Sequence, residues 1–329
     1  MNFTELVGLA NGHVEARIIQ SALELSIFDA LAESSLGAEE VANRLGLEPK
    51  ATDLLLNALT SLNLLQKKAG RFSLAAIAEI YLTKSSHQYV GGMIRFESSL
   101  WSCWEKLSQA IRSGKPVRSA NMYQDDRVET EIFINAMDSL VKARGDADMM
   151  ATIIDWSKVG QLLDVGSGPA TYPIALCRKF PNLRATIVDL PATLRITQRF
   201  VQEAGMVDRI RLIAGDYRSD PIPDDYDVVF LSNIIHGEDY PGNETLIRKL
   251  ASNLKKSGRM IIKDHILDES RANPPVGAIF SLLMLLTTAG GRCYSFHEVR
   301  AWMTAGGLSN IEQIELPPPL TSSLVVGSR

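Results

Sequence analysis

The sequence has few cysteines, no sign of a metal-binding spacing and little net charge. Its three cysteines, Cys103, Cys177 and Cys293, lie far apart and form no CxxC pair. An odd number of separated thiols excludes a disulfide framework and indicates a reducing compartment. The formal net charge of −4 gives no general attraction to phosphate backbones or anionic lipid. We therefore expect no nucleic-acid partner and no metal site.

Segments that would bring the chain to a membrane are missing as well. The start, Met1–Glu5, lacks both the basic and the apolar region of a secretion signal. The longest apolar run, Ala278–Leu286, is well short of the roughly 18 residues that span a bilayer. These absences predict a soluble, cytoplasmic protein with no membrane partner.

The chain has enough apolar material for more than one folded domain. Its 329 residues are 46% hydrophobic and 22% charged, which excludes a disordered or collagen-like chain. Domains usually take about 100–200 residues. We expect a winged-helix-like domain over 1–95, a helical connector over 96–155 and an α/β domain over 156–329.

The first 95 residues have the order of a winged helix. Helical spacing of apolar residues runs from Ala16 to Leu31, from Glu39 to Leu45 and from Ala51 to Leu62, and two short strands follow over 64–74. Such modules often bind DNA, but here basic and acidic residues are mixed and no strongly basic face results. This favours a structural or dimerisation module.

The rest of the chain changes from helices to an alternation of strands and helices. Helical patterns cover 97–112 and 129–153, and the change comes at Gly160. Apolar runs then alternate with helical segments, which is typical of a parallel sheet. The predicted strands are Gln161–Val165, Ala185–Val188, Ile210–Ala214, Asp227–Leu231 and Arg259–Ile262, followed by a terminal pair at Ile311–Leu316 and Leu324–Val326.

A glycine turn and acidic side chains follow the first three predicted strands. Gly166 and Gly168 allow a tight turn and the close approach of a ligand. The third position of the dinucleotide fingerprint is Thr171, so pyrophosphate is not implied. Asp189 could accept hydrogen bonds from both hydroxyls of a ribose, and Asp216 could accept one from the amino group of an adenine. Together these residues predict a nucleoside pocket.

A histidine and an acid follow the next two predicted strands. His236 comes after the fourth strand and Asp264 after the fifth, so neighbouring strands would bring them together. A histidine can take a proton from an acceptor hydroxyl while a carboxylate fixes its tautomer. His265 is a rival for the base, although strand alternation should point it away from the side of Asp264.

These motifs resemble the class I S-adenosylmethionine-dependent O-methyltransferases of the caffeate, isoflavone and hydroxyindole type. The resemblance covers nearly the whole chain, through Asp164-Val165-Gly166-Ser167-Gly168, Val188-Asp189-Leu190-Pro191 and Ala214-Gly215-Asp216-Tyr217. It implies a winged-helix domain for homodimerisation, a connector that lines the substrate site, and a Rossmann-like domain with a seven-stranded, mostly parallel sheet that binds S-adenosylmethionine.

The same resemblance implies roles for single residues. His236 would be the catalytic base and Asp264 its assisting acid. The cofactor would be bound by Gly166, Gly168, Asp189, Leu190, Asp216, Tyr217 and Ser232. Met137 and Met284 would hold the acceptor ring, although their spacing alone would favour core filling on amphipathic helices.

The chain departs from the family pattern at three places. Ala170 replaces a third glycine, which a cofactor loop tolerates if φ is negative there. Gly237-Glu238-Asp239 replaces the Asp-Trp that commonly follows the histidine, and Cys293 stands where a second acid often flanks the base.

We therefore expect a homodimeric enzyme that methylates a hydroxyl of an aromatic or polyketide-like small molecule. One alternative is a C-methyltransferase acting on an electron-rich ring or macrocycle. An alternative of another class is a winged-helix regulator whose α/β domain senses a nucleoside.

Overall fold

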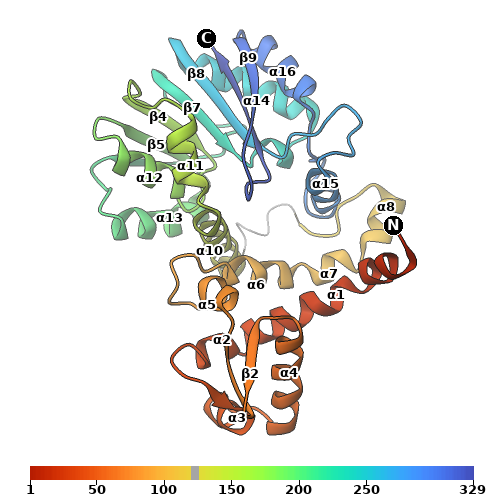
Figure 1. Cartoon of the computed structure of the whole chain (residues 1–329). Coiled ribbons are helices and arrows are strands. Elements are labelled where there is room, and N and C mark those ends of the chain that lie inside the picture. The colour runs from red at the N-terminus through yellow and green to blue at the C-terminus, as the bar shows by residue number, and fades with distance from the viewer. Residues whose placement is uncertain (120–125) are drawn as a thin grey trace. The chain divides into compact units, whose positions relative to one another are not determined.

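The computed structural model describes residues 1–119 and 126–329 (Figure 1). Residues 120–125 of the expected connector lie outside these ranges. The chain divides into two compact units: the first consists of Met1–Leu100 and Asn135–Ala143, and the second of Trp101–Ile134 and Arg144–Arg329. Each unit has its own cluster of buried apolar side chains.

The first unit has the expected order of helices followed by a hairpin. Its small antiparallel sheet has the order β1-β3-β2. Ala69 and Gly70 join the hairpin strands with positive φ at both positions, as a tight hairpin turn requires. Phe28, Leu56 and Phe72 are fully buried in its core. The elements are α1 (Phe3–Glu24), α2 (Ile27–Ala30), β1 (Leu36–Gly37), α3 (Ala38–Leu45), α4 (Pro49–Ser61), β2 (Leu65–Lys68), β3 (Arg71–Leu74), α5 (Ala76–Leu82) and α6 (Gly91–Ser99).

Three helices expected to be continuous are interrupted, so those predictions were wrong. Ser26, with φ +59°, ends the run from Ala16 to Leu31, and Gly145, with φ +70°, ends the run over 129–153. A left-handed residue breaks the hydrogen-bond ladder while the apolar spacing continues through it. The run over 97–112 is divided among α6 and two short helices. The resulting elements are α7 (Trp101–Trp104), α8 (Leu107–Ser113), α10 (Arg127–Arg144) and α11 (Asp146–Ile153).

The second unit is built on a seven-stranded sheet of order β6-β5-β4-β7-β8-β10-β9. The strands β4 to β8 are parallel to one another, and β10 runs antiparallel to both β8 and β9. The strands are β4 (Gln161–Val165), β5 (Arg184–Asp189), β6 (Ile210–Ala214), β7 (Tyr226–Ser232), β8 (Leu254–Asp264), β9 (Ser309–Glu315) and β10 (Ser323–Ser328). This agrees with the strand order along the chain expected from the sequence.

Helices connect the strands and bury both faces of this sheet. A large apolar cluster joins inward residues such as Val165, Leu231 and Ile262 to Leu250 and Trp302 on helices. Figure 1 shows α12 and α13 beside β4 and β5, and α14 and α16 beside β8 and β9. The connecting elements are α12 (Thr171–Lys179), α13 (Pro191–Glu203), η1 (Ile235–Gly237), α14 (Tyr240–Ser252), α15 (Pro275–Thr287) and α16 (Phe296–Ala305).

The parallel strands place their carboxyl ends at one edge of the sheet. Loops there follow β4, β5, β6, β7 and β8 in turn, and such an edge is where open α/β sheets bind ligands. Over residues 1–119 and 126–329, no helix has both the length and the apolar character needed to cross a bilayer.

Candidate active site

The turn after β4 is a tight left-handed loop. Gly166 and Gly168 have φ of +67° and +60°, and a Cβ at Gly166 would lie 2.4 Å from Cδ1 of Ile234. Ala170 also has a positive φ, +63°. A cofactor loop was expected to tolerate an alanine here only with a negative φ, and this expectation is not met. The left-handed region costs an L-residue roughly 1–2 kcal/mol, and the loop holds Ala170 in it at the start of α12.

The Asp189 carboxylate is bound into this turn. Its Oδ2 accepts the backbone N–H of Gly168 (2.9 Å), and its Oδ1 accepts the backbone N–H of Leu190 (2.7 Å). These two contacts fix the carboxylate at the end of β5, facing the glycine loop. Leu190 thus supplies a backbone donor that orients the acid, in addition to the cofactor contact implied for it by the family.

Two carboxylates in this region are buried without a cationic partner. Asp164 accepts the Ser167 hydroxyl at 2.6 Å, and neither Asp164 nor Asp189 forms an ion pair among the described residues. Burial raises the pKa of Asp164 to about 7 and the pKa of Asp189 to about 6. Buried acids without a counter-charge fit a cationic ligand, and a sulfonium cofactor is one.

The rim beside β6 holds a second polar group. Asp216 is paired with Arg218, with contacts of 2.8 to 3.1 Å, and this hydrogen bonding lowers the pKa of Asp216. The Tyr217 hydroxyl donates to Oε1 of Glu238 at 2.9 Å, and the Tyr217 ring lies near the position where a Gly166 Cβ would be. Glu238 therefore fixes the orientation of the Tyr217 ring beside Gly166.

His236 and Asp264 follow the adjacent strands β7 and β8 and are in contact, as the sequence predicted. The Nδ1 atom of His236 lies 2.8 Å and 3.0 Å from the two carboxylate oxygens of Asp264. Asp264 is almost completely buried, and His236 is 13% exposed in its side chain. Burial alone would raise the pKa of Asp264, but the two neighbouring histidines hold it below its ordinary value. An ionised acid at Nδ1 leaves Nε2 as the imidazole nitrogen that can accept a proton.

His265 lies closer to this pair than strand alternation suggested. Its ring and the ring of His236 both contact Phe280, with centroid distances of 5.2 Å and 4.8 Å. The expectation that it points away was wrong because β8 ends at Asp264, so alternation does not continue to His265. Its Nδ1 is hydrogen-bonded to the Thr321 carbonyl at 2.8 Å, and burial lowers its pKa.

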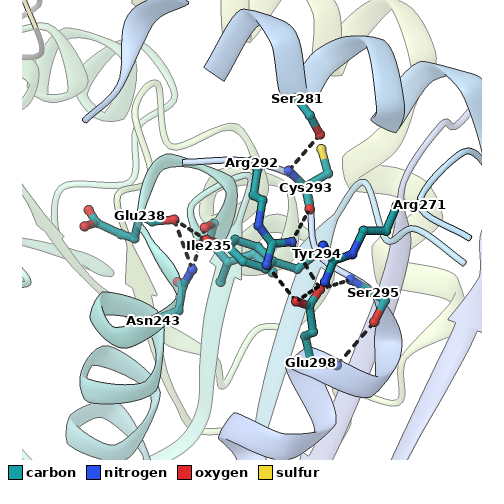
Figure 2. A network of polar contacts seen from close by, with 10 residues as sticks. All are labelled: Ile235, Glu238, Asn243, Arg271, Ser281, Arg292, Cys293, Tyr294, Ser295 and Glu298. Atoms are coloured by element: carbon teal, nitrogen blue, oxygen red, sulfur yellow. Dashed lines mark hydrogen bonds and ion pairs between the residues drawn. The ribbon is translucent and has the colours of Figure 1, made fainter. Parts of the chain in front are cut away.

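The turn that carries His236 is held from two sides (Figure 2). The side-chain amide of Asn243 donates to the carbonyl of Ile235 at 2.8 Å, and the Tyr294 hydroxyl donates to the carbonyl of Glu238 at 2.6 Å. Arg292 lies over the Tyr294 ring, 4.1 Å from its centroid. Buried hydrogen bonds to both ends of so short a turn restrict the movement of the imidazole.

Glu298 anchors the segment that supplies Tyr294. It pairs with Arg292 at 2.7 Å and with Arg271 at 3.2 Å, and it accepts the backbone N–H of Ser295 at 2.9 Å (Figure 2). The sequence alone did not point to Asn243, Tyr294 or Glu298. The sequence offered no signal for Asn243, because its neighbours Gly242 and Glu244 do not mark it as a buried position.

Cys293 is buried beside the acid of the pair and stays a neutral thiol. Burial, with Asp264 as a second cause, raises the pKa of Cys293 to about 12. Its backbone N–H donates to the Ser281 hydroxyl on α15 at 3.1 Å (Figure 2). Asp264 is therefore the ionised acid beside His236.

The two methionines lie in different units. Met284 is buried on α15, the helix that also carries Phe280. Met137 is half-buried on α10, in the stretch that belongs to the first unit. Within the described ranges, no group of three or more His, Cys, Asp or Glu side chains is placed to hold a metal ion.

Comparison with known proteins assigns the chain to a family. Residues 104–309 match the O-methyltransferase domain, and residues 7–84 match the O-methyltransferase dimerisation domain. The chain belongs to the O-methyltransferase family. It is an S-adenosylmethionine-dependent methyltransferase, so the expected family, fold class and cofactor are confirmed.

Similar proteins cover the chain almost from end to end. The 3-hydroxy-5-methyl-1-naphthoate 3-O-methyltransferase of Streptomyces sahachiroi is 30% identical over 98% of this chain and 94% of its own length. The tetracenomycin polyketide synthesis 8-O-methyl transferase of Streptomyces glaucescens is 28% identical over 97% and 95%. The solved structure of PigF with SAH has the same fold, with a TM-score of 0.90, 24% identity and coverage of 100% of both chains.

Proposed function

We propose that this O-methyltransferase methylates a hydroxyl of an aromatic or polyketide-like small molecule, with His236 as the general base. The observation that carries the proposal is the 2.8 Å contact between His236 and Asp264 at the carboxyl edge of the sheet. His236 follows β7, the strand that pairs with β4 and its glycine turn. The two relatives described above act, by their names, on a naphthoate and in polyketide synthesis. Their names supply the substrate class.

The glycine turn and Asp189 would hold the cofactor. The family's cofactor supplies a methyl group attached to a sulfonium, which is already a good methyl donor. The positive φ of Gly166 and Gly168 forms the tight turn at the carboxyl edge of the sheet, and the Asp189 carboxylate can accept hydrogen bonds from ribose hydroxyls. Asp164 and Asp189 supply negative charge on the side where a positive ligand would lie.

His236 and Asp264 would move the proton. His236 donates its Nδ1 hydrogen to Asp264, so Nε2 can take the proton of the acceptor hydroxyl as the oxygen becomes a nucleophile. The ionised Asp264 stabilises the imidazolium that results. The turn braced by Asn243 and Tyr294 keeps Nε2 in place, and such positioning supplies much of the rate in a transfer that needs alignment.

The side chains beside the base suit an apolar ring. Phe280 lies edge-on to His236, and the buried Met284 is one helical turn farther along α15. We propose that Phe280 and Met284 contact an aromatic acceptor; the role of Met137 rests on the family resemblance alone.

We also propose that the enzyme is a homodimer built by its first unit. The dimerisation domain matches residues 7–84. Helix α1 carries an exposed apolar stripe at helical spacing, formed by Phe3, Leu6, Val7 and Val14. A second copy of the chain would cover such a stripe.

Transfer of a labelled methyl group to a panel of phenols and naphthols tests the proposed reaction. A labelled methyl ether is the expected product. It should form at an unchanged rate in the presence of a chelator, because no divalent ion takes part in the proposed step. A label on ring carbon would support the C-methyltransferase alternative. Binding of S-adenosylhomocysteine without methylation of any hydroxyl would contradict the proposed acceptor class.

A further inference from the structure

The turn that carries His236 contacts the glycine turn at its first residue. Strand β7 ends at Ser232, and residues 234–238, which we call the His236 turn, follow shortly after it. Cδ1 of Ile234 lies 2.4 Å from the point that a Cβ on Gly166 would occupy. The Ile234 side chain therefore packs directly against the backbone of the glycine turn.

Glu238 closes the other end of the His236 turn. Its backbone N–H donates to the carbonyl of Ile235 at 3.3 Å, and this hydrogen bond spans His236. Its own carbonyl accepts the Tyr294 hydroxyl at 2.6 Å and the Asn243 side-chain amide at 3.4 Å (Figure 2). A displacement of the Glu238 backbone therefore moves the turn that holds the imidazole.

The side chain of Glu238 reaches the glycine turn through Tyr217. The Tyr217 hydroxyl donates to Oε1 of Glu238 at 2.9 Å, and Cε1 of the same ring lies 3.8 Å from the point that a Cβ on Gly166 would occupy. Burial raises the pKa of Tyr217 above its ordinary value, so the hydroxyl keeps the proton that it donates. Oε1 of Glu238 also lies 3.9 Å from Nη1 of Arg218, so the hydrogen bond to Tyr217 is the shorter of these two contacts.

His236 thus lies between two links to the same turn. Ile234 is two residues before it and contacts the glycine turn directly. Glu238 is two residues after it and reaches the glycine turn through Tyr217. Coupling between sites is carried by contiguous packed side chains and hydrogen bonds, and both kinds of contact are present here.

We infer that Glu238 is a positioning residue that connects the cofactor site to the proposed base. It transmits the position of the Tyr217 ring, against which the cofactor would bind, to the His236 imidazole. The inference rests on the proposed function, which makes His236 the base. It also gives a role to Gly237-Glu238-Asp239, the segment in which the sequence departs from the family pattern.

The imidazole signal of His236 in nuclear magnetic resonance tests this inference without turnover. The chain has five histidines, and in protein labelled with carbon-13 histidine the signal that is lost in His236→Ala belongs to His236. Saturating S-adenosylhomocysteine, with binding confirmed by calorimetry for each variant, should shift this signal in the wild type. The shift should fall to less than half in Glu238→Ala and in Tyr217→Phe.

Two further variants separate the hydrogen bond from a general effect of substitution. Glu238→Gln should keep most of the ligand-induced shift, because an amide oxygen can still accept the Tyr217 hydroxyl. Glu244→Ala is the matched control, since Glu244 is a partly exposed acid on α14 that pairs with Arg248. It should leave the shift at its wild-type size. Tyr217→Phe removes a single oxygen atom, so it tests the link even if Glu238→Ala does not fold.

Kinetics give an independent measurement of the same link. At saturating S-adenosylmethionine and acceptor, Glu238→Ala should lower kcat about five- to tenfold, the size of one hydrogen bond. In a His236→Ala background the same substitution should lower kcat less than twofold, because no base remains to be positioned.

Three results would overturn the inference. A shift of wild-type size in Glu238→Ala with the ligand bound would mean that Glu238 transmits nothing, and a wild-type imidazole signal that ignores the ligand would mean that the two sites are independent. An equal loss of kcat with and without His236 would mean that Glu238 only supports the fold. Full activity of His236→Ala would instead contradict the proposed function, and the ligand-induced shift would still decide whether the link exists.

Discussion

A Cβ atom at Gly291 would lie 2.2 Å from the carbonyl oxygen of His236. It would also lie 2.7 Å from the Thr288 hydroxyl, whose oxygen accepts the backbone N–H of Gly291 at 2.9 Å. The backbone of Gly291 thus packs directly against the turn that carries the proposed base. The position of His236 therefore depends on a residue 55 positions later in the chain.

Gly291→Ala should displace the His236 turn and lower turnover. A misplacement of about 1 Å can reduce a rate by as much as about 10²-fold, so we expect a loss of one to two orders of magnitude in kcat. S-adenosylhomocysteine affinity, measured by calorimetry, should change little. Gly237→Ala is the control, since a Cβ there meets no atom within 4 Å. Equal losses in the two variants would argue against a specific role for the Gly291 contact.

His236→Ala should remove base catalysis. Loss of a general base typically lowers kcat by about 10²- to 10⁴-fold, and cofactor affinity should be nearly unchanged. The measurement is kcat against the pKa of a series of phenol acceptors. The variant should show a steeper dependence because a more acidic phenol needs less help. A variant that keeps most of its activity would show that His236 is not the base.

Asp264→Asn should have a smaller effect than loss of the histidine. The amide keeps the shape at Nδ1 but removes the charge that stabilises the imidazolium, so the loss in kcat should grow as the acceptor's pKa rises. The same phenol series measures this effect. A uniform loss across the series would indicate that Asp264 only supports the local structure.

Asp189→Ala should weaken binding of S-adenosylmethionine. Removal of a charge-assisted contact should cost about 1.5–3 kcal/mol. Since the pKa of Asp189 is raised to about 6, the carboxylate is protonated at lower pH and becomes a poorer acceptor. Wild-type affinity should therefore fall between pH 7 and pH 5 in calorimetry. Asp189→Asn should bind weakly with a flatter pH profile, and an unchanged profile would contradict the assignment.

Asp164 should make the cofactor-free protein less stable as pH rises. Its pKa is about 7 in the fold against an ordinary value of 3.8, so the fold binds this proton more tightly than the unfolded chain. The stabilisation is complete below about pH 4 and is lost as pH rises through 7, an effect of up to about 4 kcal/mol. Denaturant unfolding of Asp164→Asn should therefore depend less on pH. Asp208→Asn, on the surface, should keep the wild-type profile.

Light scattering at micromolar concentration should give twice the chain mass of 36.2 kDa. Leu6→Asp and Val14→Asp place a charge in the exposed stripe of α1 and should shift the protein toward monomer. Thr4→Asp, exposed on the same helix outside the stripe, is the control. A wild-type monomer would refute the proposed dimer.

The sequence by itself determined the features that have a local signature. The strands β4 to β8 are short apolar runs separated by helical spacing, and this rhythm alone predicted a parallel sheet. The glycines at 166 and 168 and the acids after successive strands were readable because parallel strands bring their carboxyl ends to one edge. The meeting of His236 with Asp264 followed from the same rule.

Only the tertiary structure decided the contacts that join distant segments. Periodicity tells which residues are buried but not which partner each one meets, so the sequence did not pair Lys263 with Asp146 or place Tyr294 and Gly291 against the His236 turn. The positive φ of Ala170 is likewise imposed by the loop around it, against the residue's own preference. Local propensities are short-range, whereas these contacts depend on how strands far apart in the chain are ordered in the sheet.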